Sequence, residues 1–501
     1  MTKNHLFRQP FLSKIFTMKK TNYLNIFILA IALVFSSCSS DDDNNDTIDP
    51  TDDGGTELPN PEPEPEAIDL STYDNGSRVM MQAFYWDVEP RFAWWDNLSE
   101  KVPGWADAGV DRIWIPSPAK GQSGGYSMGY DPSDYYDFGN FEQHGTVETR
   151  FGSRAELENL IAVSHDNDVE VIADIVLNHN SGGGLQYNPY RDEETYTLFN
   201  EENGNASGMF NRTYEDFYPN SVSEFDPGSL FYPETNLDHH RERVQDWLWK
   251  DENSVAKYYK NVMGFDGWRF DYVKGFEPWV VKEWLAEVGG FSVGENFDGN
   301  PDVLRDWIES SGSPAFDFST FYKLEESLDR FQDLSNLEND MLWKTDAANA
   351  VTFTANHDTE KDDNVDNYIA SENKLKAYAY ILTHPGYPTI FYSDYENADF
   401  QDEIKQMIAI HNSIATGETE ILYADQDEYI MKRNGTGTNP GLILYISINN
   451  STKRRAVSSN WNNVTLMDYS GNSTYNPTSD ENGAVTIEVP ANGYAIWSIT
   501  E

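Results

Sequence analysis

The stretch FDGWRFDYVKG, from Phe265 to Gly275, decides the fold of this chain. Its aromatic and apolar side chains predict a buried strand, but Arg269 and Asp271 lie two positions apart within it. Successive side chains of a strand alternate between its two faces, so this cation and this carboxylate share one face. The stretch therefore predicts a core strand that ends in charged groups.

The chain beyond Asn75 repeats this pattern, because short apolar runs alternate with segments of helical periodicity. The eight runs are VMMQAFY, RIWIPSP, VEVIADIV, FDGWRFD, FSVGEN, AFDFS, AVTFTAN and PTIFY. Such alternation predicts a parallel sheet, and eight repeats predict an α/β fold with a closed (β/α)8 TIM barrel. Between the second and third runs, Ser153 and Glu156 predict the capping box of a barrel helix.

Two departures from even spacing divide the folded part into regions. The third run ends near Val176 and the fourth begins at Phe265, so the connection is far longer than one helix. Beyond about Thr416 the pattern changes to alternating strands with turns, which predicts an antiparallel β-domain. The predicted boundaries are 76–179 and 240–415 for the barrel, 180–239 for a lobe inserted after the third strand, and 416–501 for the C-terminal domain.

Polar residues follow four of the predicted barrel strands. Active sites of such barrels lie at the C-terminal ends of the strands, so these residues are expected to converge on one rim. A single carboxylate at a strand end is more often a helix cap, but four polar ends in order favour acid–base chemistry. The residues are Asp174, Asn178 and His179, then Arg269, Asp271 and Lys274, then Glu295, and finally Asn356, His357 and Asp358.

The motifs DIVLNH, GWRFDYVKG, VGEN and FTANHD resemble the four signature regions of the α-amylase family of glycoside hydrolases, family 13. The resemblance runs from about Gly76 to the C-terminus. GGYSMGYDPSDYYDFG and GTVETRFGS are most similar to the archaeal and plant-type members. The resemblance implies an enzyme that cuts internal α-1,4-glucosidic bonds of starch- or glycogen-type glucans and retains the anomeric configuration.

The resemblance also implies a role for each catalytic residue. Asp271 would be the nucleophile, and Glu295 would protonate the leaving oxygen and then activate water. Asp358 would hold the sugar hydroxyls and stabilise positive charge in the transition state. Arg269 would keep Asp271 ionised, because an adjacent guanidinium favours the charged form of a carboxyl group.

Further residues would bind the substrate by the same resemblance. His179 and His357 would donate hydrogen bonds to the sugar at the point of cleavage. Tyr130 would stack on that sugar, although a Tyr packed in the core explains the same residue equally well. Lys274 and Gly275 would line the side of the leaving group.

Members of this family carry a structural calcium ion between barrel and lobe, and calcium prefers oxygen ligands. The resemblance places this ion at Asn178, Asp226, Gly228, Asn236 and Gly275. Asn236 stands where the family usually has Asp, which keeps an oxygen but removes a negative charge.

Archaeal members often add a zinc ion held by two His and one Cys. The corresponding positions here are Tyr218, Ser223 and Asp238, so we expect no zinc.

The N-terminus resembles that of an exported bacterial lipoprotein. Lys19 and Lys20 precede an apolar run that ends at Cys38, the only cysteine of the chain. We predict a signal peptide at residues 1–37, lipidation of Cys38 and an acidic, Pro-rich tether at 38–75. A plain cleaved signal or a core cysteine is the alternative, and either Met1 or Met18 fits as the start. The acidic stretch after Cys38 resembles export tags of Bacteroidetes, so we expect an outer-membrane lipoprotein at the cell surface.

The formal charge of −49 excludes nucleic acid as a partner and predicts a strongly solvated surface. We expect a monomer whose partner is a polysaccharide and whose membrane contact is limited to the lipid anchor. A related maltooligosaccharide-forming enzyme or transglycosylase would use the same residues. A non-catalytic glucan-binding lipoprotein, or a relative that uses the barrel only for partner contacts, is disfavoured because all three carboxylates are present.

Overall fold

The computed structural model describes residues 65–228, 230–360 and 368–501. These described residues all belong to one compact unit. The predicted signal peptide, Cys38 and residues 38–64 of the predicted tether lie outside the described residues. None of the described helices is long and apolar enough to cross a membrane.

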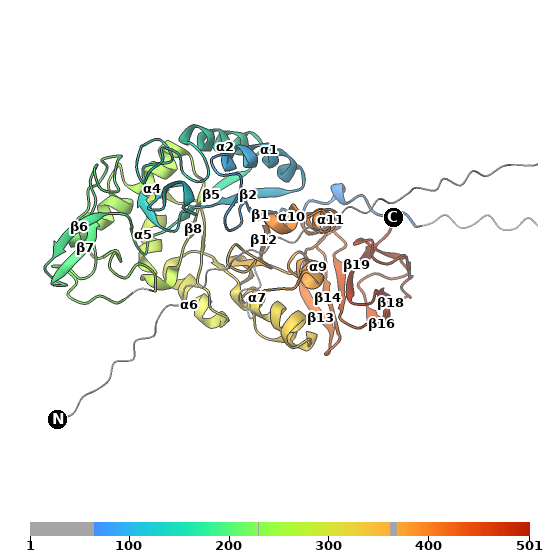
Figure 1. The fold of residues 1–501 in the computed structure, drawn as a ribbon. Coiled ribbons are helices and arrows are strands. Elements are labelled where there is room, and N and C mark those ends of the chain that lie inside the picture. Colours follow the sequence, from blue (N-terminus) through green and yellow to red (C-terminus); the bar gives the residue numbers. More distant parts are fainter. Residues whose placement is uncertain (1–64, 229, 361–367) are drawn as a thin grey trace, which may run out of the picture. The chain divides into compact units, whose positions relative to one another are not determined.

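Eight parallel strands close into a barrel in the order β1-β12-β11-β10-β9-β8-β5-β2 (Figure 1). Each strand overlaps one of the eight predicted apolar runs, so the predicted barrel is confirmed. The strands are β1 (Val79–Gln82), β2 (Val110–Ile115), β5 (Glu170–Ile175), β8 (Gly267–Phe270), β9 (Phe291–Gly294), β10 (Ala315–Phe316), β11 (Ala350–Phe353) and β12 (Tyr387–Phe391).

Helices connect the strands and bury one face each against the barrel. α2 begins at the predicted capping box, in which Ser153 and Glu156 bond to each other's backbone N–H groups. Such a box satisfies N–H groups that the first helical turn leaves without partners. The described α-helices are α1 (Trp94–Asp107), α2 (Arg154–Asp166), α3 (Glu242–Gln245), α4 (Val255–Tyr258), α5 (Trp279–Val288), α6 (Pro301–Ser311), α7 (Phe318–Glu325), α8 (Leu342–Asp346), α9 (Ser371–Ile381), α10 (Tyr392–Tyr395) and α11 (Gln401–Ser413).

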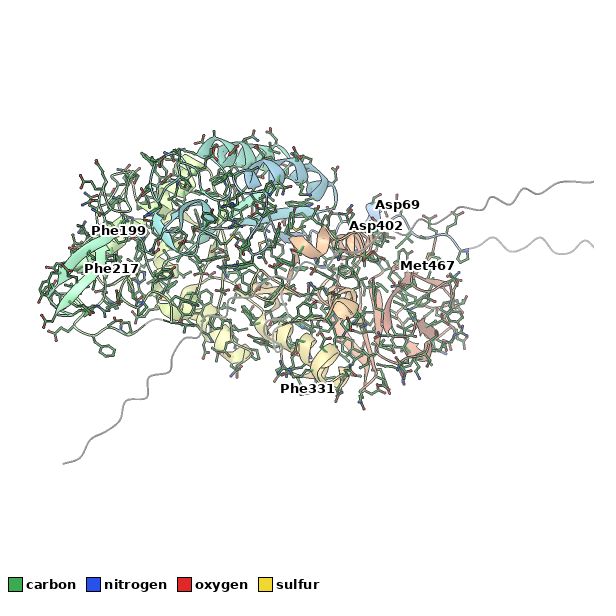
Figure 2. All side chains as sticks on the ribbon, viewed as in Figure 1. Asp69, Phe199, Phe217, Phe331, Asp402 and Met467 are labelled. Carbon is green, nitrogen blue, oxygen red and sulfur yellow. The ribbon has the colours of Figure 1, made fainter. Side chains whose placement is uncertain are left out.

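The inserted lobe contains more regular structure than its composition suggests. Strands β6 (Gly184–Asn188) and β7 (Glu193–Leu198) pair as an antiparallel hairpin, which lies at the end of Figure 1 opposite the C-terminal sheet. Phe199 and Phe217, labelled in Figure 2, are fully buried, and their ring centroids are 5.8 Å apart. The lobe therefore has a small core of its own. Nearby, β3 (Lys120–Gly121) and β4 (Pro132–Asp134) form a second short pair.

A buried arginine fastens the lobe to the barrel. The guanidinium of Arg212 donates hydrogen bonds to the Ser133 carbonyl (2.8 Å) and to the side-chain oxygens of Asn180 (3.1 Å) and Asn205 (2.9 Å). It also lies over the rings of Phe199 and Trp247, 4.5 and 4.6 Å from their centroids. Burial lowers the pKa of Arg212 to about 10. These three acceptors are carbonyl and amide oxygens, and none is a carboxylate. Arg212 therefore attaches the lobe through hydrogen bonds to neutral oxygens.

The C-terminal domain is antiparallel, as predicted. Its main sheet has the order β13-β14-β15-β19-β17, and β16 pairs with β18 in a second sheet. Its inner residues belong partly to the barrel core, so the two regions share one apolar interior. The strands are β13 (Thr419–Ala424), β14 (Glu428–Arg433), β15 (Leu442–Ser447), β16 (Lys453–Ser458), β17 (Leu466–Asp468), β18 (Ala484–Val489) and β19 (Gly493–Ile499).

The folded body begins earlier than the predicted tether boundary at residue 75. Ala67 pairs with Thr500, and the backbone N–H of Ile68 donates to the Tyr469 hydroxyl at 2.9 Å. The side chain of Ile68 is buried. The acidic, Pro-rich composition of this segment gave no indication of these apolar residues, whose burial stabilises the fold. The end of the predicted tether, from Ala67 onward, thus belongs to the folded unit.

Candidate active site

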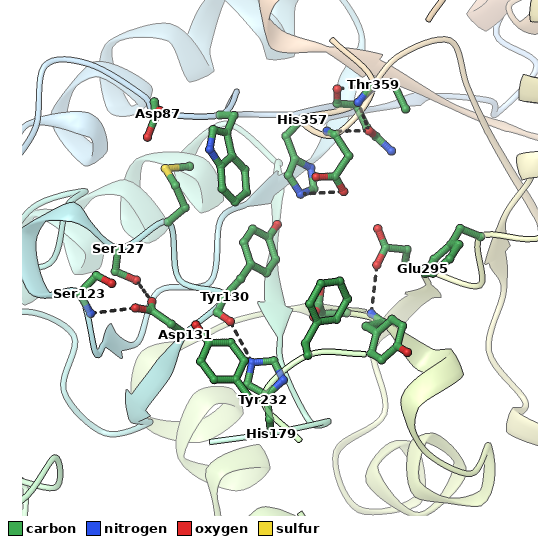
Figure 3. A pocket seen from close by; sticks show the side chains of 18 of the residues that line it. Asp87, Ser123, Ser127, Tyr130, Asp131, His179, Tyr232, Glu295, His357 and Thr359 are labelled. Carbon is green, nitrogen blue, oxygen red and sulfur yellow. Dashed lines mark hydrogen bonds and ion pairs between the residues drawn. The ribbon is translucent and has the colours of Figure 1, made fainter. Parts of the chain in front are cut away.

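A cavity of about 760 Å³ lies where the ends of the barrel strands meet the lobe (Figure 3). In Figure 3, Glu295 lies on one side of this cavity and faces Tyr130 and His357 across it. The predicted site residues that line the cavity are Tyr130, His179, Asp271, Glu295, His357 and Asp358. The fold thus brings together groups that are more than 200 residues apart in the sequence.

Arg269 is the centre of the charged cluster below this cavity. Its Nη1 donates to Asp271 Oδ1 at 2.8 Å and to Asp174 Oδ1 at 2.9 Å, and its Nη2 lies 2.6 Å from Glu295 Oε1. The guanidinium is almost completely buried. Asp174 reaches it because β5 and β8 are neighbours in the barrel and pair Asp174 with Arg269 in register. One cation therefore holds three carboxylates from three adjacent strands.

The two candidate catalytic carboxyl groups are held in an unusual electrostatic state. Burial raises the pKa of Asp271 and the pKa of Glu295, while the Arg269 guanidinium opposes both shifts. The expectation that Arg269 simply keeps Asp271 ionised is therefore incomplete, because one positive charge is shared among three carboxylates. Such a cluster favours retention of a proton by one of the carboxyl groups, which suits general acid catalysis.

Asp174 supports this cluster from behind. Its Oδ2 accepts hydrogen bonds from the Tyr130 hydroxyl at 2.8 Å and from the Trp114 indole N–H at 3.0 Å. These two bonds and the Arg269 contact fix Asp174 in place, which in turn orients the guanidinium. The ring of Tyr130 is thereby fixed at the cavity wall, so its hydroxyl is structural while its face is presented to the cavity.

His357 is a neutral donor at the cavity. Burial lowers its pKa to about 4. Gln82 Nε2 lies 3.0 Å from Nδ1 of the ring, and this amide orientation assigns the proton to Nε2. Nε2 lies 3.5 Å from Asp358 Oδ2, whose side chain is 57% exposed. Both residues line the cavity, and their predicted contacts with a sugar stay predictions.

His179 also lines the cavity, but its hydrogen bonds are made within the protein. Nε2 lies 2.9 Å from the Tyr130 carbonyl, to which it donates, and Nδ1 lies 3.0 Å from Asn178 Nδ2. Burial lowers the pKa of His179 to about 4, so the ring is neutral. A bond from His179 to a sugar would have to replace or share the bond to Tyr130.

The aromatic residues of the cavity were largely missed from the sequence. Trp86, just beyond β1, is parallel within 9° to Tyr130, and their centroids are 5.9 Å apart. On the opposite side, Phe231, Tyr232 and Phe297 also line the cavity. Aromatic residues fill cores as readily as they bind ligands, so only the position of Trp86 after a strand end gave any signal in the sequence.

The turn after β8 connects the two carboxyl groups. Tyr272 has a positive φ of 42°, which is uncommon for a residue with a side chain. Its backbone N–H donates to Glu295 Oε2 at 3.0 Å. This conformation therefore places a backbone donor from the residue after Asp271 on the carboxyl group of Glu295.

Lys274 and Gly275 follow this turn but do not line the cavity. Lys274 Nζ bonds to Asp298 Oδ2 and to the Phe297 carbonyl, each at 3.0 Å. A Cβ atom on Gly275 would lie 2.1 Å from Asn178 Oδ1, so this close approach requires glycine. Their predicted place on the leaving-group side stays a prediction.

The predicted calcium ligands divide into two groups. Asn178 lies against Gly275 as described, and its carbonyl accepts from the N–H of Leu237, next to Asn236. Asp226, the one carboxylate of the set, instead bonds to the Arg191 guanidinium and accepts at Oδ1 from the Gly228 N–H at 2.8 Å.

No cluster of three or more His, Cys, Asp or Glu residues suited to a metal occurs within residues 65–228, 230–360 and 368–501. The carboxylate of Asp226 already bonds to Arg191. The predicted calcium ligands therefore do not fit a calcium ion bound through Asp226 while Arg191 keeps its position. The absence of zinc at Tyr218, Ser223 and Asp238 stays a prediction.

The sequence matches two known families in the regions just described. Residues 93–279 match the family described as alpha amylase, catalytic domain, and residues 442–498 match the family described as alpha-amylase C-terminal. The first match contains the β5 and β8 ends of the charged cluster, and the second lies within the C-terminal sheets.

Characterised relatives and solved structures agree with these matches. The chain is 30% identical to probable alpha-amylase 2 of Arabidopsis thaliana over 372 residues, covering 67% of this chain and 80% of that protein. It is 25% identical to the cytoplasmic alpha-amylase of Escherichia coli K12 over 497 residues, covering 84% and 99%. The structure of the alpha-amylase from Geobacillus thermoleovorans complexed with acarbose superposes with a TM-score of 0.63 at 19% identity, covering 85% and 98%. All three are similar along most of their length.

Proposed function

The chain belongs to the α-amylase family, its activity is the hydrolysis of internal α-1,4-glucosidic bonds of glucans, and we propose that Asp271, Glu295 and Asp358 carry it out with retention of configuration. The observation that carries this proposal is the position of Arg269, which bonds to both Asp271 and Glu295 beneath the cavity. Two carboxyl groups on one guanidinium lie side by side. Retaining glycosidases need this short separation, whereas inverting ones leave room for a water molecule.

In the first step a glucan lies in the cavity with one sugar against the Tyr130 ring. Glu295 gives its proton to the glycosidic oxygen as the bond from that oxygen to the anomeric carbon breaks. The electron pair of that bond stays on the leaving oxygen. An oxygen of Asp271 forms a new bond to the anomeric carbon, which yields a glycosyl-enzyme. The raised pKa of Glu295 supports its role as the acid.

In the second step Glu295, now ionised, accepts a proton from a water molecule. The water oxygen attacks the anomeric carbon, and the bond to Asp271 breaks with its electron pair returning to the carboxylate. Two inversions give net retention. Arg269 contributes in both steps, because it bonds to the Asp271 carboxylate before attack and after release.

Asp358 and His357 bind the sugar beside the reacting carbon. Asp358 presents a carboxylate to the cavity, where it accepts hydrogen bonds from sugar hydroxyls. The same charge stabilises the positive charge that develops in the transition state. The neutral His357 donates a hydrogen bond from Nε2 without adding a positive charge that would oppose the transition state. No step of this mechanism passes through a metal ion.

A direct test is the anomeric form of fresh product. NMR spectra recorded within the first minutes of maltooligosaccharide hydrolysis should show the α-anomer before mutarotation. An early excess of the β-anomer would refute the retaining assignment. Chromatography of the products from amylose, pullulan, dextran and cyclodextrins would separate endo-hydrolysis from a maltooligosaccharide-forming or transglycosylating output.

Export and anchoring are a separate proposal that rests on the sequence. Lys19, Lys20, the apolar run and Cys38 follow one another in the order of a lipoprotein signal, and an acidic, Pro-rich segment comes next. A lipid on Cys38 would hold the enzyme at the outer membrane, facing polysaccharide outside the cell. Labelled palmitate should enter the wild-type chain and should fail to enter Cys38→Ala. Absence of label from the wild type would exclude the anchor.

A further inference from the structure

Arg191 lies in the turn between β6 and β7 and reaches across the lobe to the loop at residues 218–233. Its Nη2 donates to the Tyr218 carbonyl at 3.0 Å and to the Pro233 carbonyl at 3.1 Å, and it also bonds to Asp226 Oδ2. The side chains of Arg191 and Asp226 are only 19% and 20% exposed. Three oxygens from one loop therefore converge on a single nitrogen atom.

A carboxylate and backbone carbonyls are also the oxygen types that bind hard cations, and here they surround one positively charged nitrogen. An arginine at a surface ion pair usually presents two nitrogens to one carboxylate in a fork. Here a single nitrogen, Nη2, bonds to the carboxylate of Asp226. The carbonyls of Tyr218 and Pro233 accept further hydrogen bonds from the same nitrogen. The guanidinium of Arg191 therefore supplies the positive charge that these three oxygens contact.

The charges of the predicted ligand set agree with this interpretation. Asn236 stands where the family usually has Asp, so Asp226 is the one carboxylate among the five predicted ligands. A divalent ion would face a single negative charge there, whereas one guanidinium matches it. A calcium ion at bonding distance from Asp226 would also lie within a few ångströms of Arg191, and like charges at that distance repel strongly.

We propose that Arg191 takes the place of a divalent cation at Asp226, so that an internal ion pair holds Tyr218, Asp226 and Pro233 together and calcium is not needed there. Arg212 already fastens the lobe to the barrel through neutral oxygens. The lobe is therefore held by two arginines with different tasks. This inference concerns the lobe and is independent of the catalytic assignment.

The proposal is tested by the melting temperature and the calcium content of the full-length protein. Four proteins are compared after exhaustive chelation and again with added calcium: wild type, Arg191→Gln, Arg191→Lys, and Arg191→Gln combined with Asn236→Asp. Arg305→Gln is the matched control, because Arg305 pairs with Asp302 on the exposed side of α6. The metal itself is the probe, and bound calcium is counted by elemental analysis.

We expect the wild-type melting temperature to be the same with chelator and with calcium. Arg191→Gln should melt about 2–5 °C lower, because it leaves Asp226 and two carbonyls without their donor. Arg191→Lys should recover most of this loss, and Arg305→Gln should change little. The double variant has two carboxylates and no competing guanidinium, so it should bind about one calcium ion and melt higher when calcium is added.

Two outcomes would overturn the proposal. The first is a wild-type melting temperature that falls on chelation, with the response abolished by Asp226→Asn, because calcium would then be bound through Asp226. The second is an Arg191→Gln protein with the same melting temperature as the wild type, because the guanidinium would then not stabilise the lobe. If Arg191→Gln fails to fold, the chelation of wild type and of Asp226→Asn still decides between the two cations.

Discussion

The rim of the barrel and the lobe beside it each contain a buried arginine, and the two arginines differ in what surrounds them. Arg269 is shared by three carboxylates, whereas Arg212 bonds only to backbone carbonyls and to the amide oxygens of two Asn side chains. At the rim, negative charge exceeds positive charge, and burial raises the pKa of the carboxyl groups. In the lobe, burial instead lowers the pKa of the cation to about 10.

The difference shows how one side chain can build either a reactive or an inert site. Positive charge is scarce at the rim, so burial raises the pKa values of the acidic groups there, which suits proton transfer. The partners of Arg212 in the lobe are neutral oxygens that do not titrate, so Arg212 serves packing and attachment. The following predictions test this contrast, beginning with the largest effect.

Removing either candidate catalytic carboxylate should abolish turnover without unfolding the protein. Asp271→Asn loses the nucleophile, and Glu295→Gln loses the proton donor, so each should lower kcat by at least about 10³-fold. The measurement is kcat on a defined maltooligosaccharide, with circular dichroism to verify the fold. Asp302→Asn, on the exposed start of α6, is the matched control and should keep its activity. Near-normal turnover by either site variant would break the assignment of the rim as reactive.

Replacing Arg269 by Lys should damage activity and change its pH dependence. Lysine is a point charge that cannot bridge Asp174, Asp271 and Glu295 at once, so kcat should fall by roughly 10²-fold. Because Arg269 lowers the pKa of Asp271, its loss should raise that pKa further and move the acidic limb of the pH–rate profile to higher pH. A profile that keeps its acidic limb would show that Arg269 does not tune the pair.

The matching change in the lobe, Arg212→Met, should act on stability instead. It removes the donor of three hydrogen bonds to buried oxygens and should lower the free energy of unfolding by about 2–4 kcal/mol. The pH–rate profile of the folded enzyme should stay in place, which is the readout that separates the two arginines. Denaturant melts and pH profiles of Arg212→Met and Arg269→Lys should therefore show opposite patterns. A shifted pH profile for Arg212→Met would contradict the contrast.

The smallest expected effect concerns His411, which lies in neither the rim cluster nor the lobe. Burial lowers its pKa from 6.5 to about 4, and Nδ1 donates to the Leu382 carbonyl at 3.0 Å. Between these values the unfolded histidine binds a proton that the folded one does not, so stability falls as the pH drops from 6.5 towards 4. His411→Asn keeps a donor for Leu382 but cannot titrate. Between pH 6.5 and 5.5 it should lose about 1 kcal/mol less than wild type, and an identical pH dependence would contradict this origin.

Much of the barrel could be predicted because its signals are local. Alternation along a strand places Arg269 and Asp271 on one face, and the strand order places their neighbours on the same rim. The eight apolar runs correspond to the eight barrel strands, and Ser153 with Glu156 forms the predicted cap. The acidic composition near residue 75, in contrast, concealed the contacts of Ala67 and Ile68 with the C-terminal domain.

Periodicity and spacing within a few residues predict the barrel, the C-terminal domain and the carboxylates at the strand ends. The pairing of cations with oxygens depends instead on contacts between segments that are distant in the sequence. Asp174 reaches Arg269 on the neighbouring strand, 95 residues away in the sequence, Arg212 reaches Ser133 from 79 residues away, and Arg191 reaches Asp226 across the lobe. The physical reason is that a charged side chain is stabilised by whichever partners folding brings within bonding distance, and no local pattern records that choice.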